Sequence, residues 1–127
     1  MAKRDLYNNI SVAASVAPAV LTATGTGTGV DARGFQSVTA VINTGAIVAA
    51  GLFTPKLQES DDNSAWSDVA AADLLGSFAN LAASAVQRVG YKGSKRYVRV
   101  VLTYVSGTSI AAGAVVILGH AELAPVA

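Results

Sequence analysis

The sequence predicts an all-β protein: an antiparallel β-sandwich or jelly-roll-like barrel with at most one short helix. Three observations lead to this fold class. Apolar and polar residues alternate over short segments, and these segments recur about every ten residues with turn residues between them. The hydrophobic fraction of 52% also consists largely of small and β-branched side chains, with 25 alanines and 17 valines. A core built from such small pieces requires close packing.

The clearest strand lies in the last third of the chain. Over residues 96–105 one alternating set is apolar, whereas the opposite set carries Arg99 and Thr103. The turn Ser106-Gly107-Thr108-Ser109 then leads into residues 114–121, which are apolar on both faces and suit a strand covered on both sides. Three earlier segments follow the alternating pattern less completely: residues 37–43, 52–59 and 86–91.

Proline, alanine and glycine modify this pattern. Pro55 restricts its segment to an edge strand or a bulge. The alanine-rich segment Ala46–Ala50 is too short for an independent helix, and Gly76 limits residues 67–85 to one helical turn. The run Gly25-Thr26-Gly27-Thr28-Gly29 is interpreted as a mobile loop between strands.

The chain length predicts a single domain. A chain of 127 residues leaves little room for two cores, and no proline-rich or serine-rich linker divides it. We therefore expect one β-sandwich domain over residues 1–127, with residues 1–9 as a candidate N-terminal arm. Such an arm can become ordered on a neighbouring molecule, and a frayed terminus is the alternative. Its candidate contact residues are Lys3, Arg4, Leu6 and Tyr7.

Composition and charge argue against several classes of protein. The absence of cysteine excludes a disulfide scaffold, and 9 Lys+Arg against 8 Asp+Glu produce no overall field that would attract nucleic acid. Three uncharged stretches have the length of a membrane span, but polar or turn-forming residues interrupt each one, so we expect turns between strands. No export signal is apparent at the N-terminus. The interruptions are Pro18 with Thr22 and Thr24, Asn43-Thr44-Gly45, and Ser106-Gly107-Thr108-Ser109.

No motif points to catalysis, a cofactor or a metal ion. The glycine run lacks the Gly-Lys-Ser/Thr ending of a phosphate-binding loop. His120, the only histidine, is expected to be structural at a strand end, because no nucleophile or second ligand stands at a characteristic spacing. Asp61 and Asn63 lack the rest of a calcium loop and suit a solvated turn that bonds its own backbone. Trp66 is expected to pack back over the sheet.

The charged residues gather in two stretches. Five of the eight acids lie within residues 59–73, and five of the nine basic residues lie within residues 88–99. The basic stretch suits a solvated hairpin, a contact with nucleic acid, or pairing with the acidic stretch of another subunit or partner. Its candidate interface residues are Arg88, Lys92, Lys95 and Arg96.

Several short motifs follow one another in an order that spans most of the chain. They are Asp5-Leu6-Tyr7-Asn8-Asn9-Ile10, residues 29–35, 59–69, 72–76 and 89–93, Lys95-Arg96-Tyr97-Val98-Arg99-Val100 and Gly119-His120-Ala121. In this order they resemble a family of small virion proteins encoded beside the major capsid protein in tailed double-stranded DNA phages, prophages and gene-transfer agents. The resemblance implies a jelly-roll β-sandwich that decorates or cements a phage head without catalysis.

The expected location is therefore the outer surface of a virion capsid, after synthesis in the bacterial cytoplasm. The expected partners are the major capsid protein and further copies of the chain in a small homo-oligomer, with no direct contact to nucleic acid or membrane. A head-spike base or a tail-associated protein is the alternative within the same class. A carbohydrate-binding module is a third reading, although one Trp, four Tyr and three Phe provide few exposed aromatic platforms.

Overall fold

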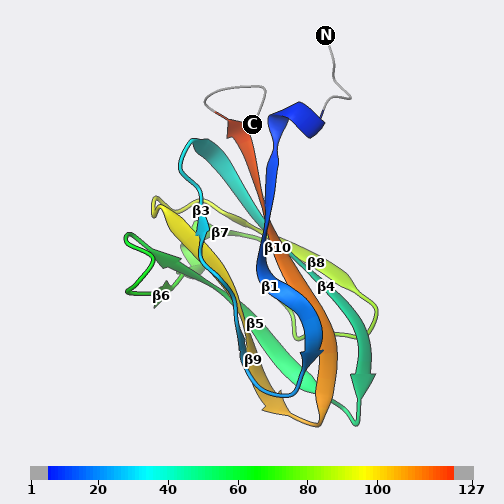
Figure 1. The fold of residues 1–127 in the computed structure, drawn as a ribbon. Coiled ribbons are helices and arrows are strands. Elements are labelled where there is room, and N and C mark those ends of the chain that lie inside the picture. The colour runs from blue at the N-terminus through cyan, green and yellow to red at the C-terminus, as the bar shows by residue number, and fades with distance from the viewer. Residues whose placement is uncertain (1–5, 122–127) are drawn as a thin grey trace.

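The protein folds into two antiparallel sheets that face each other, as seen in a computed structural model that describes residues 6–121 (Figure 1). Sheet A has the strand order β1-β10-β4-β8-β7, and sheet B has the order β2-β9-β5-β6, with β3 also paired to β9. The described residues contain no α-helix, and the all-β sandwich prediction is confirmed. The elements are η1 (Tyr7–Asn9), β1 (Ser11–Leu21), β2 (Gly25–Thr26), β3 (Val30–Asp31), β4 (Phe35–Val48), β5 (Leu52–Ser60), β6 (Ser67–Asp68), η2 (Ala71–Asp73), β7 (Leu74–Leu75), β8 (Val86–Tyr91), β9 (Tyr97–Ser106) and β10 (Ser109–Ala121).

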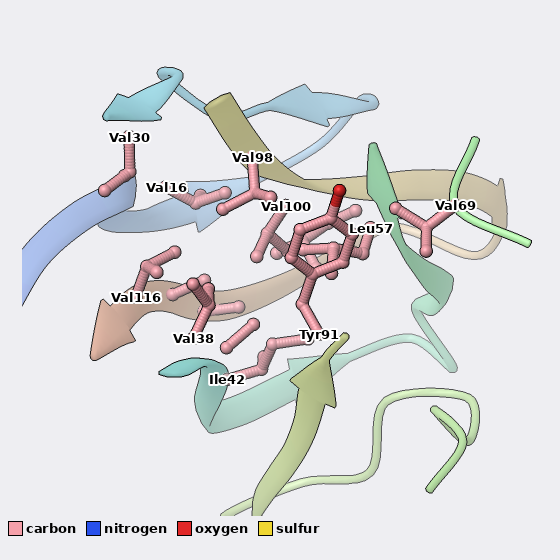
Figure 2. Packing of buried hydrophobic residues seen from close by; sticks show 14 of the residues in the cluster. Val16, Val30, Val38, Ile42, Leu57, Val69, Tyr91, Val98, Val100 and Val116 are labelled. Atoms are coloured by element: carbon pink, nitrogen blue, oxygen red, sulfur yellow. The ribbon is translucent and has the colours of Figure 1, made fainter. Parts of the chain in front are cut away.

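The core lies between the two sheets and is made of small and branched side chains (Figure 2). Ile42 and Val116 project into it from sheet A, while Val98 and Val100 project from sheet B, and all four are fully buried. The alternation predicted for residues 96–105 is therefore confirmed. Phe53 is the largest fully buried side chain, so it is the main anchor of a core that otherwise has few large residues.

A bulge in β1 joins the two sheets. Ser15 and Val16 are both buried there, because the register with β10 shifts between Ala14 and Val16. The Ser15 hydroxyl accepts a hydrogen bond from the backbone N–H of Val100 at 2.9 Å and donates one to the Thr28 carbonyl at 3.0 Å. The side chain thus connects an edge strand of sheet A to the central strand of sheet B.

The glycine run is packed into this junction, so the prediction of a mobile loop was wrong. Gly25 and Thr26 form β2 against β9, and the N–H of Gly27 donates to the Val100 carbonyl at 2.8 Å. The N–H of Thr28 donates to the Ser15 carbonyl at 2.6 Å. Small residues are needed here because two strands approach closely.

One further predicted turn is wrong and another is right only in part, because Thr22 and Thr24 do lie between β1 and β2. Pro18 lies inside β1, where its missing N–H is tolerated because β1 is the edge of sheet A. The Asn43-Thr44-Gly45 segment continues β4, because β10 pairs with β4 as far as Val48. The chain turns only at Ala49 and Ala50, both with positive φ as in a two-residue hairpin turn.

Other predictions about elements hold. Pro55 pairs with Leu102 of β9 on one side, while β6 reaches only Gln58 and Glu59 on the other, so the proline occupies an edge-like position. The single helical turn expected in residues 67–85 is η2, and the reversal after Ser106 separates β9 from β10. Among the described residues, no helix has both the length and the apolar character that crossing a membrane requires.

Candidate interaction surfaces

The outer face of sheet A is a largely apolar surface with a groove of about 670 Å³. Exposed valines from two strands stand beside the groove: Val20 of β1 is 67% exposed and Val86 of β8 is 66% exposed. Only two of the lining residues, Asn43 and Thr44, have polar side chains, and none is charged. Contiguous exposed apolar surface of this kind marks sites where proteins contact other molecules.

Small residues at neighbouring positions of adjacent strands form this groove. Gly113 of β10 pairs with Asn43 of β4, and its other side is covered by Pro18 of β1. A Cβ at position 113 would lie 3.1 Å from both Cα and Cγ of Pro18, so only glycine fits without a shift. Ala111 and Gly45 add little bulk beside it. The alanine-rich and glycine-rich composition of β10 therefore shapes a concave surface.

A second, polar cleft of about 580 Å³ lies between residues 32–38 and the loop that joins β8 to β9. Its basic lining residues are Arg33, Lys92, Lys95 and Arg96. Asp61 is the one acid among the described residues that line it. Aromatic and aliphatic side chains, including Phe35 and the buried Val38, complete the lining.

Ion pairs within the chain hold two of these basic residues. Arg96 binds Asp31 in a bidentate manner, with Nε 2.9 Å from Oδ1 and Nη2 2.8 Å from Oδ2. The Lys95 ammonium lies 2.8 Å from Asp61 Oδ2. The hydrogen bond from Arg96 lowers the pKa of Asp31, and the bond to Asp61 raises the pKa of Lys95. Lys95 and Arg96 thus have acidic partners in the same chain, whereas pairing of the basic stretch with another subunit or partner stays a prediction.

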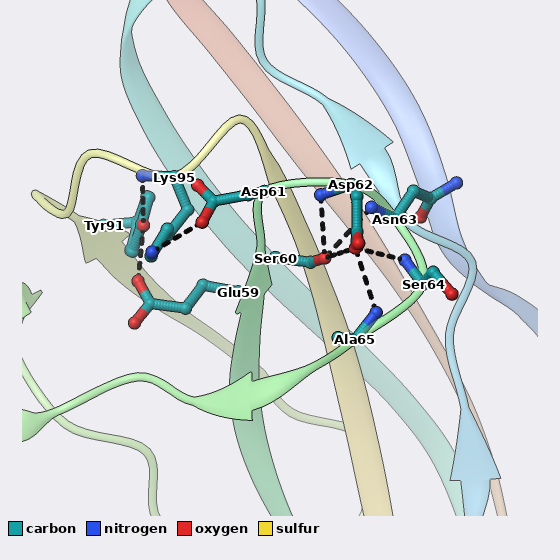
Figure 3. A network of polar contacts seen from close by, with 9 residues as sticks. All are labelled: Glu59, Ser60, Asp61, Asp62, Asn63, Ser64, Ala65, Tyr91 and Lys95. Carbon is teal, nitrogen blue, oxygen red and sulfur yellow. Dashed lines mark hydrogen bonds and ion pairs between the residues drawn. The ribbon is translucent and has the colours of Figure 1, made fainter.

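The acidic stretch folds into the self-bonded turn that the sequence predicts (Figure 3). Asp62 Oδ1 accepts hydrogen bonds from the backbone N–H groups of Ser64 at 2.9 Å and Ala65 at 3.0 Å, and these bonds lower the pKa of Asp62. The Ser60 hydroxyl accepts from the backbone N–H of Asn63 at 3.0 Å. The described residues contain no group of three or more His, Asp or Glu arranged to hold a metal ion.

Tyr91 ties the basic loop to the acidic stretch (Figure 3). Its hydroxyl donates to Glu59 Oε1 at 2.6 Å and accepts from the backbone N–H of Lys95 at 3.0 Å. Burial, followed by the bond to Glu59, raises the pKa of the phenol well above its usual range. The tyrosine therefore stays a neutral donor and fixes the loop after β8 against strand β5 of the other sheet.

The predicted site residues separate into three places. Lys92, Lys95 and Arg96 line the polar cleft, whereas Arg88 is exposed on β8 opposite Val41 and lies outside it. Leu6 and Tyr7 are exposed, Tyr7 to 87%, while Lys3 and Arg4 fall outside the described residues. Sequence reasoning missed the valines of the groove and also Arg33. The sequence signal that could have indicated Arg33 is the neighbouring Gly34, because glycine favours turns that expose adjacent side chains. The positive φ of Gly34 confirms such a turn.

Trp66 and His120 have structural positions. The Trp66 ring packs over sheet B as expected, with the Arg99 guanidinium 4.3 Å from its centroid. It covers the outer face of that sheet and takes no part in the core cluster. His120 ends β10, where its Nδ1 is hydrogen bonded to the Ser37 hydroxyl. The prediction of a structural histidine at a strand end is consistent with this placement.

The Asp31–Arg96 pair predicts a pH effect. Because the pKa of Asp31 is lowered from 3.8, the stabilisation by the pair is present above that pH and is lost as the pH falls through the lowered value. Arg96→Gln should raise the pKa of Asp31 toward 3.8, measured by NMR titration of the side-chain carboxyl carbon. Arg88→Gln removes an exposed cation elsewhere and should leave that pKa unchanged. An equal pKa in wild type and Arg96→Gln would contradict the assignment.

Comparisons with known proteins give structural likenesses only. No family model and no curated protein sequence matches the chain. The structure titled "PBSX exported protein XepA" matches with a TM-score of 0.60 and 21% identity over 89% of this chain, which spans only 38% of that protein's length. The structure titled "SPBc2 prophage-derived protein YomS" matches with a TM-score of 0.51 and 15% identity, over 87% of this chain and 92% of that one. At these identities the likeness shows a shared fold: this chain has the β-sandwich fold found in XepA and YomS.

Proposed function

We propose that this chain is a structural protein of a tailed-phage particle, and that it decorates the outer surface of the head by bridging neighbouring capsomers. The observation that carries the proposal is the uncharged, apolar groove on the outer face of sheet A, which is uncovered in the single chain. The shared fold with YomS, whose title calls it prophage-derived, supports the phage association, as does the order of motifs along the sequence.

The physical argument for decoration concerns binding to an assembled lattice. A bridging protein stabilises a shell only if it binds the assembled form better than the free subunits. Many copies per particle let a modest contact act collectively. The groove suits this task, because its uncharged lining of small side chains can pack closely against a complementary apolar surface without burying a charge of its own.

The test combines copy number with a variant of the groove. Particles of the encoding phage should carry on the order of hundreds of copies. The double variant Val20→Glu with Val86→Glu should reduce occupancy about tenfold or more, measured by quantitative mass spectrometry of purified particles, because it places charges on the contact face. Both valines are exposed, so the fold should be retained.

Val105→Glu is the matched control. Val105 is also exposed but lies near the end of β9 in sheet B, outside the groove, so occupancy should stay within twofold of wild type. A few dozen copies or fewer would contradict head decoration and favour a vertex or tail position. Equal loss of occupancy in the control and the groove variant would contradict the role of sheet A.

A further inference from the structure

The lining of the polar cleft contains more basic than acidic residues. Seven lysines and arginines lie within residues 6–121, and four of them line this cleft. Lys95 and Arg96 are held by Asp61 and Asp31. Arg33 and Lys92 form no ion pair with any acid in the described part of the chain, and both are exposed. Two cations at the rim are therefore available to an anionic group from outside.

The cleft is held in shape by contacts among its own walls. The N–H of Ala32 donates to the Arg96 carbonyl at 2.8 Å, which joins the loop before β4 to the loop before β9. Tyr91 fixes the second loop through the N–H of Lys95. A Cβ at Gly93 would meet the Tyr91 ring at 2.5 Å, so the glycine packs directly on that ring. A preformed cleft loses little conformational entropy when a ligand enters it.

The lining combines charge with apolar surface. Phe35, Val38 and Tyr91 provide an apolar floor beneath the basic rim. At Gly34 no atom lies within 4 Å of the place that a Cβ would occupy, and its φ of +89° exposes the backbone there. The lining is therefore mixed, with charged and polar groups beside a few apolar ones, and the polar groups can orient a ligand.

We infer that this cleft binds an acidic side chain of a partner protein. Arg33 and Lys92 bind its carboxylate, and an adjacent apolar residue of the partner packs against Phe35, Val38 and Tyr91. This inference rests on the proposed function, because it names the chemistry of one contact that a structural protein makes with a neighbour. Nucleic acid fits the cleft poorly, since two unpaired cations do not form the extended row of positive charge that neutralises a phosphate backbone.

The experiment is a titration of the purified ¹⁵N-labelled chain with short acetylated peptides, followed by NMR. The probe peptide carries two glutamates around one phenylalanine, and a second peptide carries glutamines in their place. The glutamate peptide should shift the backbone amide signals of Gly34, Gly93 and Ser94. The glutamine peptide should bind at least about tenfold more weakly, because the charge-assisted bonds are lost.

Two charge variants locate the site. Arg33→Glu with Lys92→Glu should weaken binding of the glutamate peptide at least about tenfold, since both cations that face the ligand are reversed. Arg88→Glu with Lys56→Glu carries the same change in net charge at positions outside the cleft, and should alter the affinity less than about twofold. Equal weakening by the two double variants would overturn the inference, because the peptide would then respond only to net charge.

Inorganic phosphate is the second ligand to be titrated. If phosphate shifts the same amides with an affinity equal to or greater than that of the glutamate peptide, the cleft is a phosphate site and the assignment to an acidic peptide is wrong. These titrations contain no phage particle. A negative titration therefore overturns the cleft inference alone, whereas absence of the chain from particles overturns head decoration alone.

Discussion

Phe53→Ala should lower the free energy of unfolding by about 3–5 kcal/mol, the range typical of large-to-small changes at buried aromatic sites. The Phe53 side chain is 0% exposed, and its ring meets that of Tyr104 edge-on with centroids 5.4 Å apart. The rest of the core consists mainly of valine, alanine, leucine and isoleucine, which have too little reach to fill the resulting cavity. The loss should be visible as a lower midpoint in urea denaturation with an unchanged slope.

Two controls separate the cavity from general disruption. Phe53→Leu keeps most of the apolar volume and should cost less than half as much as Phe53→Ala. Val105→Ala removes an exposed side chain and should change the free energy of unfolding by less than about 0.5 kcal/mol. If Phe53→Ala were as mild as Val105→Ala, Phe53 would not anchor the core.

The two candidate surfaces lie on different parts of the sandwich and have opposite character. The groove on sheet A has no charged lining residue, whereas the cleft beside the β8–β9 loop concentrates four cations. An apolar groove supplies contact area, and a charged cleft supplies orientation more than affinity. A particle protein that must bind one neighbour strongly and in one orientation can use both. The two surfaces share no lining residue, so the groove variant (Val20→Glu with Val86→Glu) and the cleft variant (Arg33→Glu with Lys92→Glu) can be measured independently.

The fold could be predicted because its strongest signals are local. Alternation over residues 96–105 and the turn at Gly107 depend on residues close in sequence, and both are confirmed. Strand β1 was not predicted, because a proline such as Pro18 usually interrupts a strand. Pro18 is tolerated because β1 lies at the edge of sheet A. The same applies to Gly45, which continues a strand because β10 lies beside it.

The sites were harder to predict because they depend on distant pairings. Lys95 and Asp61 are 34 residues apart, and Arg96 and Asp31 are 65 apart, so the sequence shows a basic stretch without showing which cations are already paired. Arg33 stands apart from the basic stretch in the sequence, and the pairing of β3 with β9 and the bond between Ala32 and Arg96 bring it to the cleft. The groove needs Pro18, Gly113 and Val86 to meet from three strands.

Gly27→Ala should be nearly as damaging as the loss of Phe53, through crowding instead of a cavity. A Cβ at position 27 would collide with the Ser15 hydroxyl, lie 2.5 Å from the Val100 carbonyl oxygen and lie 2.9 Å from the Ser15 carbonyl oxygen. The last two are backbone atoms of β9 and β1, so no side-chain rotation relieves the clash. Overpacking of this kind costs about 1–3 kcal/mol.

The same substitution also strains the hydrogen bonds of the junction between the sheets. Moving Gly27 lengthens its bond to Val100 and the neighbouring bond from Thr28 to Ser15, each worth about 1 kcal/mol. The free energy of unfolding should therefore fall by about 2–4 kcal/mol, and hydrogen exchange of the backbone amides at positions 27 and 28 should accelerate.

Gly119→Ala is the matched control for this prediction. Gly119 also lies in a strand, but the nearest atom to its added Cβ is the Ser37 Cβ, at 3.9 Å, which is ordinary contact. The free energy of unfolding of Gly119→Ala should differ from that of wild type by less than about 0.5 kcal/mol. Equal effects of the two glycine substitutions would mean that the close approach of β1 and β9 is not what makes glycine necessary at position 27. A large effect at position 27 alone would establish that the close approach of β1 and β9 requires glycine there.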